Sequence, residues 1–414
     1  MKDARTSPHF CRSRVLLATA VFAAWQVASA AAGTTWSVGT NGIDSPSCGR
    51  STAPCRSIGQ ALNLAAAGDT IAVGAGTYGD LNGDGAFTLP GEEQPMNFRG
   101  GDFCMLCIFK AVKIVSLHGP KVTIIDAGNA DEVAAAVVID APGATFSGFT
   151  VRHTLGTAVV VQLPPAVTIT NNILSGNRDY GISFIVDTGA PGNNYIQNNV
   201  VSDNGRGGIF VEYGVAQSAP GGVPAPNQAL FISGNVVNGN GSRGIGILQV
   251  VAGPLINFQV TNNIVGDNGD IGVVLAAPGV LLQNNTIAAN HNDGVFLEAN
   301  GAQIRGNTLI GNAGAGVRAD NVNGAVIEAN NIYGNLGLLS VPSPGNTSNC
   351  GVVNTGLAAA TPAALDARNN FWGTAQGPGP DPADNAAGGC DFNNGHTVVT
   401  PFSASGFTFL PATD

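Results

Sequence analysis

The segment Asn172-Ile-Leu-Ser-Gly-Asn177-Arg-Asp-Tyr-Gly181-Ile182 contains the pattern that decides the fold of this 414-residue chain. Its first Asn is followed five positions later by a second Asn, and four positions after that by Gly with Ile or Val. The same frame begins again at Asn199, Asn235, Asn263, Asn285 and Asn307. These asparagines lie 27, 36, 28, 22 and 22 residues apart, which indicates a repeating unit with insertions in its earlier copies.

Apolar and polar residues alternate after each frame glycine, as in Gly208-Ile-Phe-Val-Glu212, which is typical of short half-buried strands. The apolar residues one and three positions after the glycine are predicted to point inward: Ile182, Phe184, Ile209, Val211, Ile245, Ile247, Val273, Leu275, Val295 and Leu297. The residues two and four positions after it are predicted to point outward.

A short unit of about three strands cannot bury its apolar face alone, but stacked units bury it and pair each strand with its equivalents above and below. The pattern therefore predicts an all-β fold, a single-stranded right-handed parallel β-helix solenoid. Equivalent asparagines should stack at the corners and hydrogen-bond to one another and to turn backbone.

Four regions are expected along the chain. Residues 1–30 are typical of a signal peptide, because cations precede the apolar run Val15 to Val27 and Ala28-Ser29-Ala30 fits a cleavage site. Residues 31–110 should form an N-terminal cap module, 111–375 the repeats and 376–414 a C-terminal cap. Within the first module, Ser57-Ile-Gly-Gln60 resembles a capping box that starts a short helix, with Gly68 as its stop.

The charge balance limits the partners. The full chain has a formal net charge of −10, and removing residues 1–30 leaves 13 Lys+Arg against 26 Asp+Glu, a net −13. Nucleic acid is therefore not an expected partner, because phosphate binding needs a basic surface. Only 11% of residues are charged and 58 are Gly, which excludes helical bundles. No membrane span is expected after signal removal, and the predicted location is secreted, extracellular or periplasmic.

Six cysteines remain after the predicted cleavage, an even number that suits disulfides in an oxidising compartment. Sequence proximity favours three pairs, although six cysteines allow 15 connectivities. The favoured pairs are Cys48 with Cys55, Cys104 with Cys107, and Cys350 with Cys390. A redox or zinc role for Cys104-Met-Leu-Cys107 is the alternative.

One loop has the spacing of a calcium site. Asp80, Asn82 and Asp84 supply oxygens at positions one, three and five, and Gly85 stands at the position of the sharp turn. Glu92, one residue beyond the usual twelfth position, is the candidate fourth ligand. Ca²⁺ is therefore the predicted cofactor, and an Asx-rich turn without metal is the alternative.

Stacking should bring together a first candidate catalytic cluster. Glu298 and Asp320 follow corresponding glycines on adjacent coils, with Arg318 close and with His291 and Asp293 on the preceding corner. Two neighbouring carboxylates can share acid and base roles in glycoside hydrolysis, or hold a calcium ion. A solvated charged patch is the alternative.

A second candidate lies where the repeats are enlarged. The insertions at 187–194, 213–227 and 251–258 should leave equivalent strands and form a wall on one side of the solenoid. The candidate substrate-binding residues beside this wall are Arg178, Arg206, Arg243, Phe210, Glu212 and Tyr213. Aromatic rings and Arg side chains suit a sugar chain that carries carboxylates, and a loop cluster without a ligand is the alternative.

The repeating units with Asn, a second Asn five positions later and Gly four positions after that resemble the PbH1-type repeats of secreted right-handed parallel β-helix proteins, the pectate-lyase-like superfamily. The resemblance covers about Val112 to Trp372 and ends in Asn369-Asn370-Phe371-Trp372-Gly373. It implies the fold, but this superfamily contains lyases, hydrolases, epimerases, tailspikes and adhesins. The chain lacks the Asp/Arg constellation of pectate lyases and the Asp-Pro-His motif of mannuronan epimerases.

The resulting hypothesis is a secreted β-helix that binds extracellular polysaccharide along its elongated face. In the enzymatic version of this hypothesis, the protein also cleaves that polysaccharide as a lyase or glycoside hydrolase. The alternative is a non-catalytic surface or matrix protein or adhesin. The sequence does not predict the oligomeric state, and it shows no obvious apolar stripe for side-by-side association.

Overall fold

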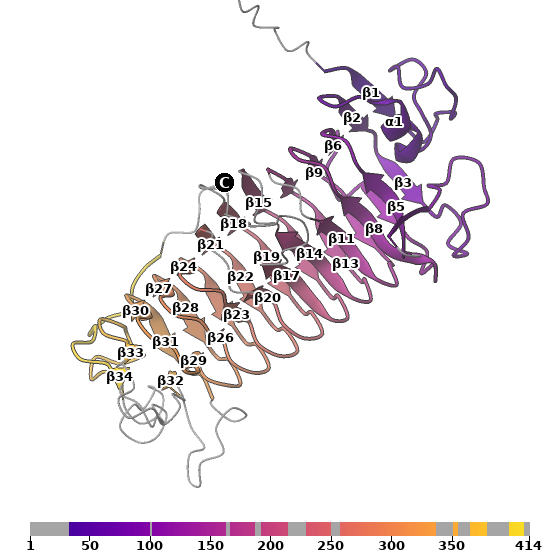
Figure 1. The fold of residues 1–414 in the computed structure, drawn as a ribbon. Coiled ribbons are helices and arrows are strands. Elements are labelled where there is room, and N and C mark those ends of the chain that lie inside the picture. The colour runs from indigo at the N-terminus through magenta and orange to yellow at the C-terminus, as the bar shows by residue number, and fades with distance from the viewer. Residues whose placement is uncertain are drawn as a thin grey trace, which may run out of the picture. The chain divides into compact units, whose positions relative to one another are not determined.

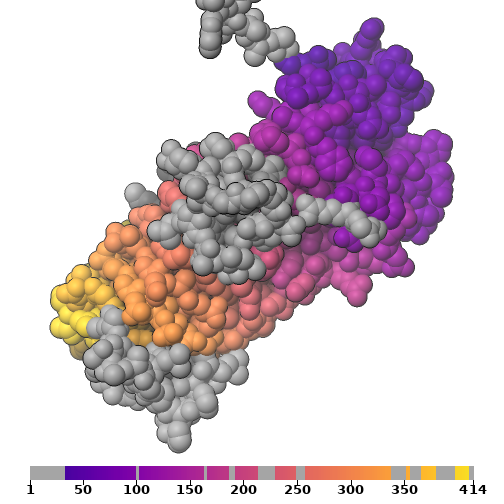
Figure 2. Space-filling model, in the orientation of Figure 1, coloured from indigo at the N-terminus to yellow at the C-terminus, as the bar shows by residue number. Residues whose placement is uncertain are grey.

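The chain winds repeatedly through three strands per turn and lays each coil on the preceding one (Figure 1). This computed structural model describes residues 33–99, 102–162, 166–186, 192–213, 229–249, 257–336, 351–354, 365–378 and 397–409. Bands of colour follow one another from indigo to yellow in Figure 2, which shows that coils adjacent in sequence are adjacent in space.

Three sheets run along the solenoid within the described residues. The first sheet contains β1 (Thr35–Val38), β2 (Thr70–Val73), β6 (Lys113–Ser116), β9 (Thr145–Ser147), β12 (Thr168–Thr170), β15 (Asn193–Gln197), β18 (Ala229–Ser233), β21 (Asn257–Thr261), β24 (Leu281–Gln283), β27 (Gln303–Arg305), β30 (Val326–Glu328), β33 (Leu365–Asp366) and β34 (Thr397–Val398). The second sheet contains β3 (Gly76–Gly79), β7 (Thr123–Asp126), β10 (Thr150–Arg152), β13 (Ile173–Ser175), β16 (Val200–Ser202), β19 (Val236–Asn238), β22 (Ile264–Gly266), β25 (Thr286–Ala288), β28 (Thr308–Ile310) and β31 (Asn331–Tyr333). The third sheet contains β4 (Met96–Arg99), β5 (Asp102–Ile108), β8 (Val133–Ile139), β11 (Thr157–Gln162), β14 (Tyr180–Val186), β17 (Gly207–Tyr213), β20 (Ile245–Gln249), β23 (Val273–Ala276), β26 (Val295–Leu297), β29 (Val317–Ala319) and β32 (Val352–Asn354).

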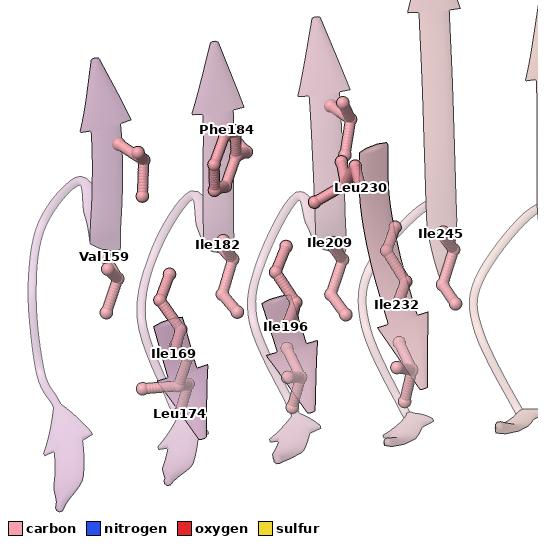
Figure 3. Close-up of a cluster of buried hydrophobic side chains, with 14 of the residues drawn as sticks. Val159, Ile169, Leu174, Ile182, Phe184, Ile196, Ile209, Leu230, Ile232 and Ile245 are labelled. Carbon is pink, nitrogen blue, oxygen red and sulfur yellow. The ribbon is translucent and has the colours of Figure 1, made fainter. Parts of the chain in front are cut away.

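Parallel pairing of equivalent strands confirms the predicted parallel β-helix. Among the described strands, only β4 and β5 at one end of the third sheet pair antiparallel. Ile182, Ile209 and Ile245 are register partners on β14, β17 and β20, and their side chains form one inward row (Figure 3). All ten inward residues predicted from the repeat are buried. Burial of each such Val or Ile side chain contributes about 1.5–3 kcal/mol.

Two columns of buried asparagines follow the corners, as predicted. The first passes from Asn172 through the repeats to Asn330 and Asn370, and the second from Asn177 to Asn335. Each Asn side chain donates to the Oδ1 atom of the equivalent Asn on the next coil, at 2.8–3.1 Å. The ladder therefore satisfies side-chain amides that would be costly to bury unpaired.

The N-terminal cap contains the short helix α1 (Ile58–Leu64). The Ser57 side chain accepts a hydrogen bond from the Gln60 amide at 3.1 Å, as the capping box predicts. The reciprocal hydrogen bond of a capping box, from the Ser57 backbone amide to the Gln60 side chain, does not form. The Ser57 amide donates to Asp44 instead, and the Gln60 side chain donates to the Ser45 carbonyl. The helix also ends before Gly68, with its C-cap at Ala65.

Two of the favoured disulfides are present, Cys48–Cys55 and Cys104–Cys107. The paired sulfurs of Cys104 and Cys107 therefore do not form a zinc site in this structure. The predicted Cys350–Cys390 bridge lies outside the described residues. No helix in the described part of the chain is long and apolar enough to cross a membrane.

Further strands continue the stack at the C-terminal end. β33 pairs with β34, Ser403 bridges to Phe371, and the Trp372 side chain is buried. The Asn331 side chain then exchanges two hydrogen bonds with the backbone of Phe407. The described part of the predicted C-terminal cap thus covers the last coils, and residues 379–396 lie outside the description.

Candidate functional site

The outer face of the third sheet contains a row of register partners whose side chains differ sharply in size. From β14 to β29 this row is Ser183, Phe210, Gly246, Val274, Phe296 and Arg318. Gly246 is the one position in this row without a side chain. The adjacent strands β14, β17 and β20 are those from which the insertions depart, and residues 187–191, 214–228 and 250–256 of these insertions lie outside the described structure.

A hollow of about 230 Å³ lies on this face. Its lining residues are Tyr180, Arg206, Ile209, Phe210, Ser242, Arg243 and Gly246. A Cβ atom added at Gly246 would lie 3.6 Å from Phe210 Cδ2 and 3.7 Å from Leu248 Cδ1, both ordinary contact distances. The missing side chain of Gly246 therefore leaves space beside the Phe210 ring, which another planar group can fill.

Two aromatic rings and one guanidinium form the ordered wall of the hollow. The Tyr180 and Phe210 rings stack with centroids 4.9 Å apart and an interplanar angle of 16°. The Arg206 guanidinium lies 5.0 Å from the Tyr180 centroid, and its Nη1 atom is 3.5 Å from Asp179 Oδ1. Cation–π attraction and this ion pair hold Arg206 at the rim.

Arg243 provides the second positive charge. Within the part of the chain that the structure describes, its guanidinium has no hydrogen-bonding or ion-pair partner. Burial raises the pKa of the Tyr180 hydroxyl, Arg206 and Arg243 lower it, and Asp179 and Glu212 raise it. Tyr180 thus stays neutral at physiological pH, and the two arginines place two guanidinium groups at the hollow, with the carboxylates of Asp179 and Glu212 nearby.

The first predicted cluster is arranged differently from expectation. Phe296 pairs with Arg318 in register, so the backbones of Glu298 and Asp320 lie on adjacent coils as predicted. The Arg318 side chain, however, bonds to Asp293 at 2.5 Å and lies 3.9 Å from the Phe296 centroid. Asp293 is fully buried and also accepts the Ala315 amide. The Asp293 carboxylate is thus occupied by Arg318 and the Ala315 amide at this corner, where the sequence predicted a member of a catalytic cluster.

The His291 side chain also contacts a residue outside the predicted cluster. Its Nε2 atom lies 3.4 Å from Asp267 Oδ1, and both side chains are largely exposed. The structure thus places the Glu298 and Asp320 backbones on adjacent coils, whereas the His291 and Asp293 side chains contact Asp267 and Arg318, respectively. Catalytic roles for these residues stay a prediction.

Comparison with known protein families shows which family the chain belongs to. Residues 40–279, more than half of the chain, match the family described as "Protein of unknown function (DUF1565)". The chain belongs to the DUF1565 family. Residues 215–370 also match the family described as "Right handed beta helix region".

Several solved structures are similar to this DUF1565 protein. The Azotobacter vinelandii mannuronan C-5 epimerase AlgE4 A-module has 16% sequence identity and a TM-score of 0.49, covering 81% of this chain and 89% of its own. The lacto-N-biosidase of family GH136 from Eubacterium ramulus has 13% identity and a TM-score of 0.48, with 89% and 67% covered. Pectate lyase Pel9A has 14% identity and a TM-score of 0.45, with 90% and 78% covered. A search of curated proteins finds no matching relative.

The second predicted cluster contains three residues that line the hollow of this DUF1565 protein: Arg206, Phe210 and Arg243. Glu212 lies two residues beyond Phe210 on β17 and acts electrostatically on Tyr180. Arg178 is exposed on a corner and does not belong to the lining. Tyr213 is the last residue of β17, and its side chain lies outside the description.

Sequence reasoning missed Tyr180, Ser242 and Gly246. Tyr180 precedes the frame glycine, and its ring leans over Gly207, its register partner, to reach Phe210. The usable signal was the glycine at position 246, where other repeats carry a side chain. An open space at this position follows from the missing side chain.

The predicted calcium loop is closed by hydrogen bonds to its own backbone. Asp80 accepts the amides of Asn82, Gly83 and Gly85, and Glu92 accepts those of Leu81 and Leu89. Within the described residues, the carboxylates of Asp80, Asp84 and Glu92 do not converge on one point. This arrangement fits the Asx-rich turn, so a bound cation would have to displace amide hydrogens. Calcium binding stays a prediction.

Proposed function

We propose that this protein binds an extracellular polysaccharide that carries carboxylate groups, and that the hollow on the third sheet is the principal contact. One observation supports this most directly: the space beside Phe210, left by Gly246, adjoins the guanidinium groups of Arg206 and Arg243. A sugar ring can stack on the aromatic face, and a carboxylate can pair with a guanidinium through two parallel hydrogen bonds.

The geometry also suits a polymer better than a single sugar. Adjacent coils are about 4.8 Å apart, so the outer face repeats at nearly the length of one sugar unit. Three coil spacings separate Phe210 from Phe296, which corresponds to about 14 Å along the solenoid. A chain seated at Phe210 can therefore reach the Glu298 and Asp320 region within a few units. The cleavage version of the hypothesis rests on this proximity.

Binding to a panel of immobilised acidic and neutral polysaccharides tests the proposal. We expect the wild type to bind acidic polymers in preference, and Arg206→Ala with Arg243→Ala to weaken binding by about a hundredfold or more, because charge-assisted hydrogen bonds contribute about 1.5–3 kcal/mol each. Arg50→Ala, at an exposed position in the N-terminal module, is the matched control. Equal binding of the double variant and the control would overturn the proposal.

The same panel separates binding from cleavage. Ultraviolet absorbance reports the unsaturated products of a lyase, and reducing ends report hydrolysis. If products form, Glu298→Gln with Asp320→Asn should abolish them while leaving binding intact. Binding without products assigns a recognition protein, and failure of all polymers to bind favours the non-catalytic structural alternative.

A further inference from the structure

The second sheet carries a continuous stripe of β-branched side chains on its outer face. Successive register partners from β3 to β28 form this outer stripe: Thr77, Ile124, Thr150, Ile173, Val200, Val236, Ile264, Thr286 and Thr308. Ile264 is 54% exposed and Val200 is 36% exposed, and Ile124, Ile173 and Val236 are partly exposed. A stripe of this kind is flat and stiff, because β-branched side chains have restricted rotamers.

The residues beside the outer stripe are small or uncharged over most of its length. The second outward row from β13 to β25 consists of Ser175, Ser202, Asn238, Gly266 and Ala288. Neither row carries a charge across these strands. The protein as a whole has a formal net charge of −10, so this is a face on which two copies can meet without bringing like charges into contact.

The end of the chain already covers one end of this surface. Beyond Thr308, the next rung is Asn331, whose side chain bonds to the backbone of Phe407. The Phe407 and Phe409 rings stack 6.0 Å apart, and Phe409 lies 3.6 Å from the position of a Cβ atom at Gly306. The described residues 397–409 thus contact the coil that follows the outer stripe, and among the described residues the stripe is uncovered from there on.

We propose that a second copy of this chain packs face to face on the outer stripe. The side chains of the outer stripe follow one another at the strand spacing of about 4.8 Å. The side chains of a second surface with the same spacing can therefore fit between them along the whole stripe. The second sheet of another copy has the same strand spacing. A two-fold axis would pair the stripe with itself, as in most homodimers. This proposal is independent of polysaccharide binding, because the hollow lies on the third sheet.

The size of the outer stripe predicts a weak dimer. From Ile124 to Thr308 it spans seven strand spacings, about 34 Å, and a strip about 12 Å wide gives an upper limit on the order of 400 Å² per partner, because the second outward row carries the Asp126–Arg152 ion pair on β7 and β10. Stable interfaces bury about 800 Å² per partner, so we expect association that depends on protein concentration. Since both copies are acidic, salt should strengthen the dimer by screening their repulsion.

Sedimentation velocity over a concentration series up to about 0.5 mM, at low and high salt, tests this proposal. The wild type should show a dimer fraction that rises with both concentration and salt. Val200→Lys with Ile264→Lys should be monomeric throughout, because it places charges in the centre of the interface. Ile43→Lys adds the same charge at another apolar position, 78% exposed, and should dimerise like the wild type.

Circular dichroism of all three proteins verifies the fold, which outward lysines leave unchanged. A wild type that is monomeric over the whole series would overturn the proposal. It would also be overturned by a double variant that dimerises like the control, or by a dimer that high salt dissociates.

Discussion

Phe210 and Gly246 are register partners on neighbouring coils, and the space beside the aromatic ring exists because its partner has no side chain. Above this space, Arg243 has a guanidinium without a partner among the described residues. Equivalent positions of successive repeats carry different residues, and this difference places an aromatic ring next to a guanidinium group on the outer face.

Filling the hollow should abolish binding without loss of stability. Gly246→Leu places a side chain against Phe210, and the backbone accepts it because Gly246 does not have a positive φ angle and an added Cβ meets its neighbours at ordinary distances. We expect polysaccharide affinity to fall at least tenfold and the melting temperature to stay within a few degrees. Gln283→Leu on the first sheet is the control, and unchanged affinity of Gly246→Leu would contradict the assigned site.

The asparagine ladder should dominate the stability of the repeats. Asn268→Ala removes the acceptor of the Asn240 backbone and side-chain amides and the side-chain donor to Asn290, and it leaves the buried Asn240 backbone amide without its acceptor. We expect a loss of about 2–4 kcal/mol in urea unfolding, whereas Asn238→Ala at an exposed position should change stability by about 0.5 kcal/mol or less. Equal effects of the two substitutions would contradict the structural role of the ladder.

Arg318 should be important for stability because it pairs with a fully buried carboxylate. Arg318→Ala removes the ion pair of Asp293 and should cost on the order of 3 kcal/mol in free energy of unfolding. Arg305→Ala breaks the exposed pair with Glu328 and should cost less than about 1 kcal/mol. If chemical denaturation gives the same midpoint shift for both, the structural role assigned to Arg318 is wrong.

Glu93 should make stability fall as pH rises. Burial raises the pKa of its carboxyl to about 7 in the folded protein, Asp44 adds to the increase, and the Ile58 and Gly59 amides and Arg56 oppose it. Because the folded pKa exceeds the ordinary value of 4.5, the stabilising contribution is full below about pH 4.5 and is lost as pH rises past about 7. The total change is on the order of 3 kcal/mol.

Denaturation of the wild type and of Glu93→Gln at several pH values measures this contribution. The difference in unfolding free energy between the two proteins should change between pH 4.5 and 8 with the sign given above. A difference that stays constant across this range would show that Glu93 does not titrate there.

The repeat allowed the fold to be predicted because local spacing determines it. Asn172 and Asn177 mark corners, Ile182 follows a frame glycine, and stacking then dictates every register partner. The site was only partly predictable, because its contacts depend on how side chains from different coils orient. Arg318 bonds to Asp293, and Tyr180 leans toward Phe210, for reasons of packing that the repeat does not encode.

The outer stripe illustrates the same limit. Its members Val200, Val236 and Ile264 are separated in sequence by 36 and 28 residues, so no local window shows an apolar face. The sequence alone therefore shows no obvious apolar stripe. The stripe emerges only when the register of the second sheet aligns these residues.

The central claim is that the hollow recognises the carboxylates of a polysaccharide. Isothermal titration of the wild type and Arg243→Ala with a uronic-acid polymer, and with the same polymer after reduction of its carboxyl groups, measures this directly. We predict that the wild type binds the acidic form at least tenfold more tightly than the reduced form, and that Arg243→Ala loses most of this preference. Equal affinity of the wild type for both forms would contradict the claim.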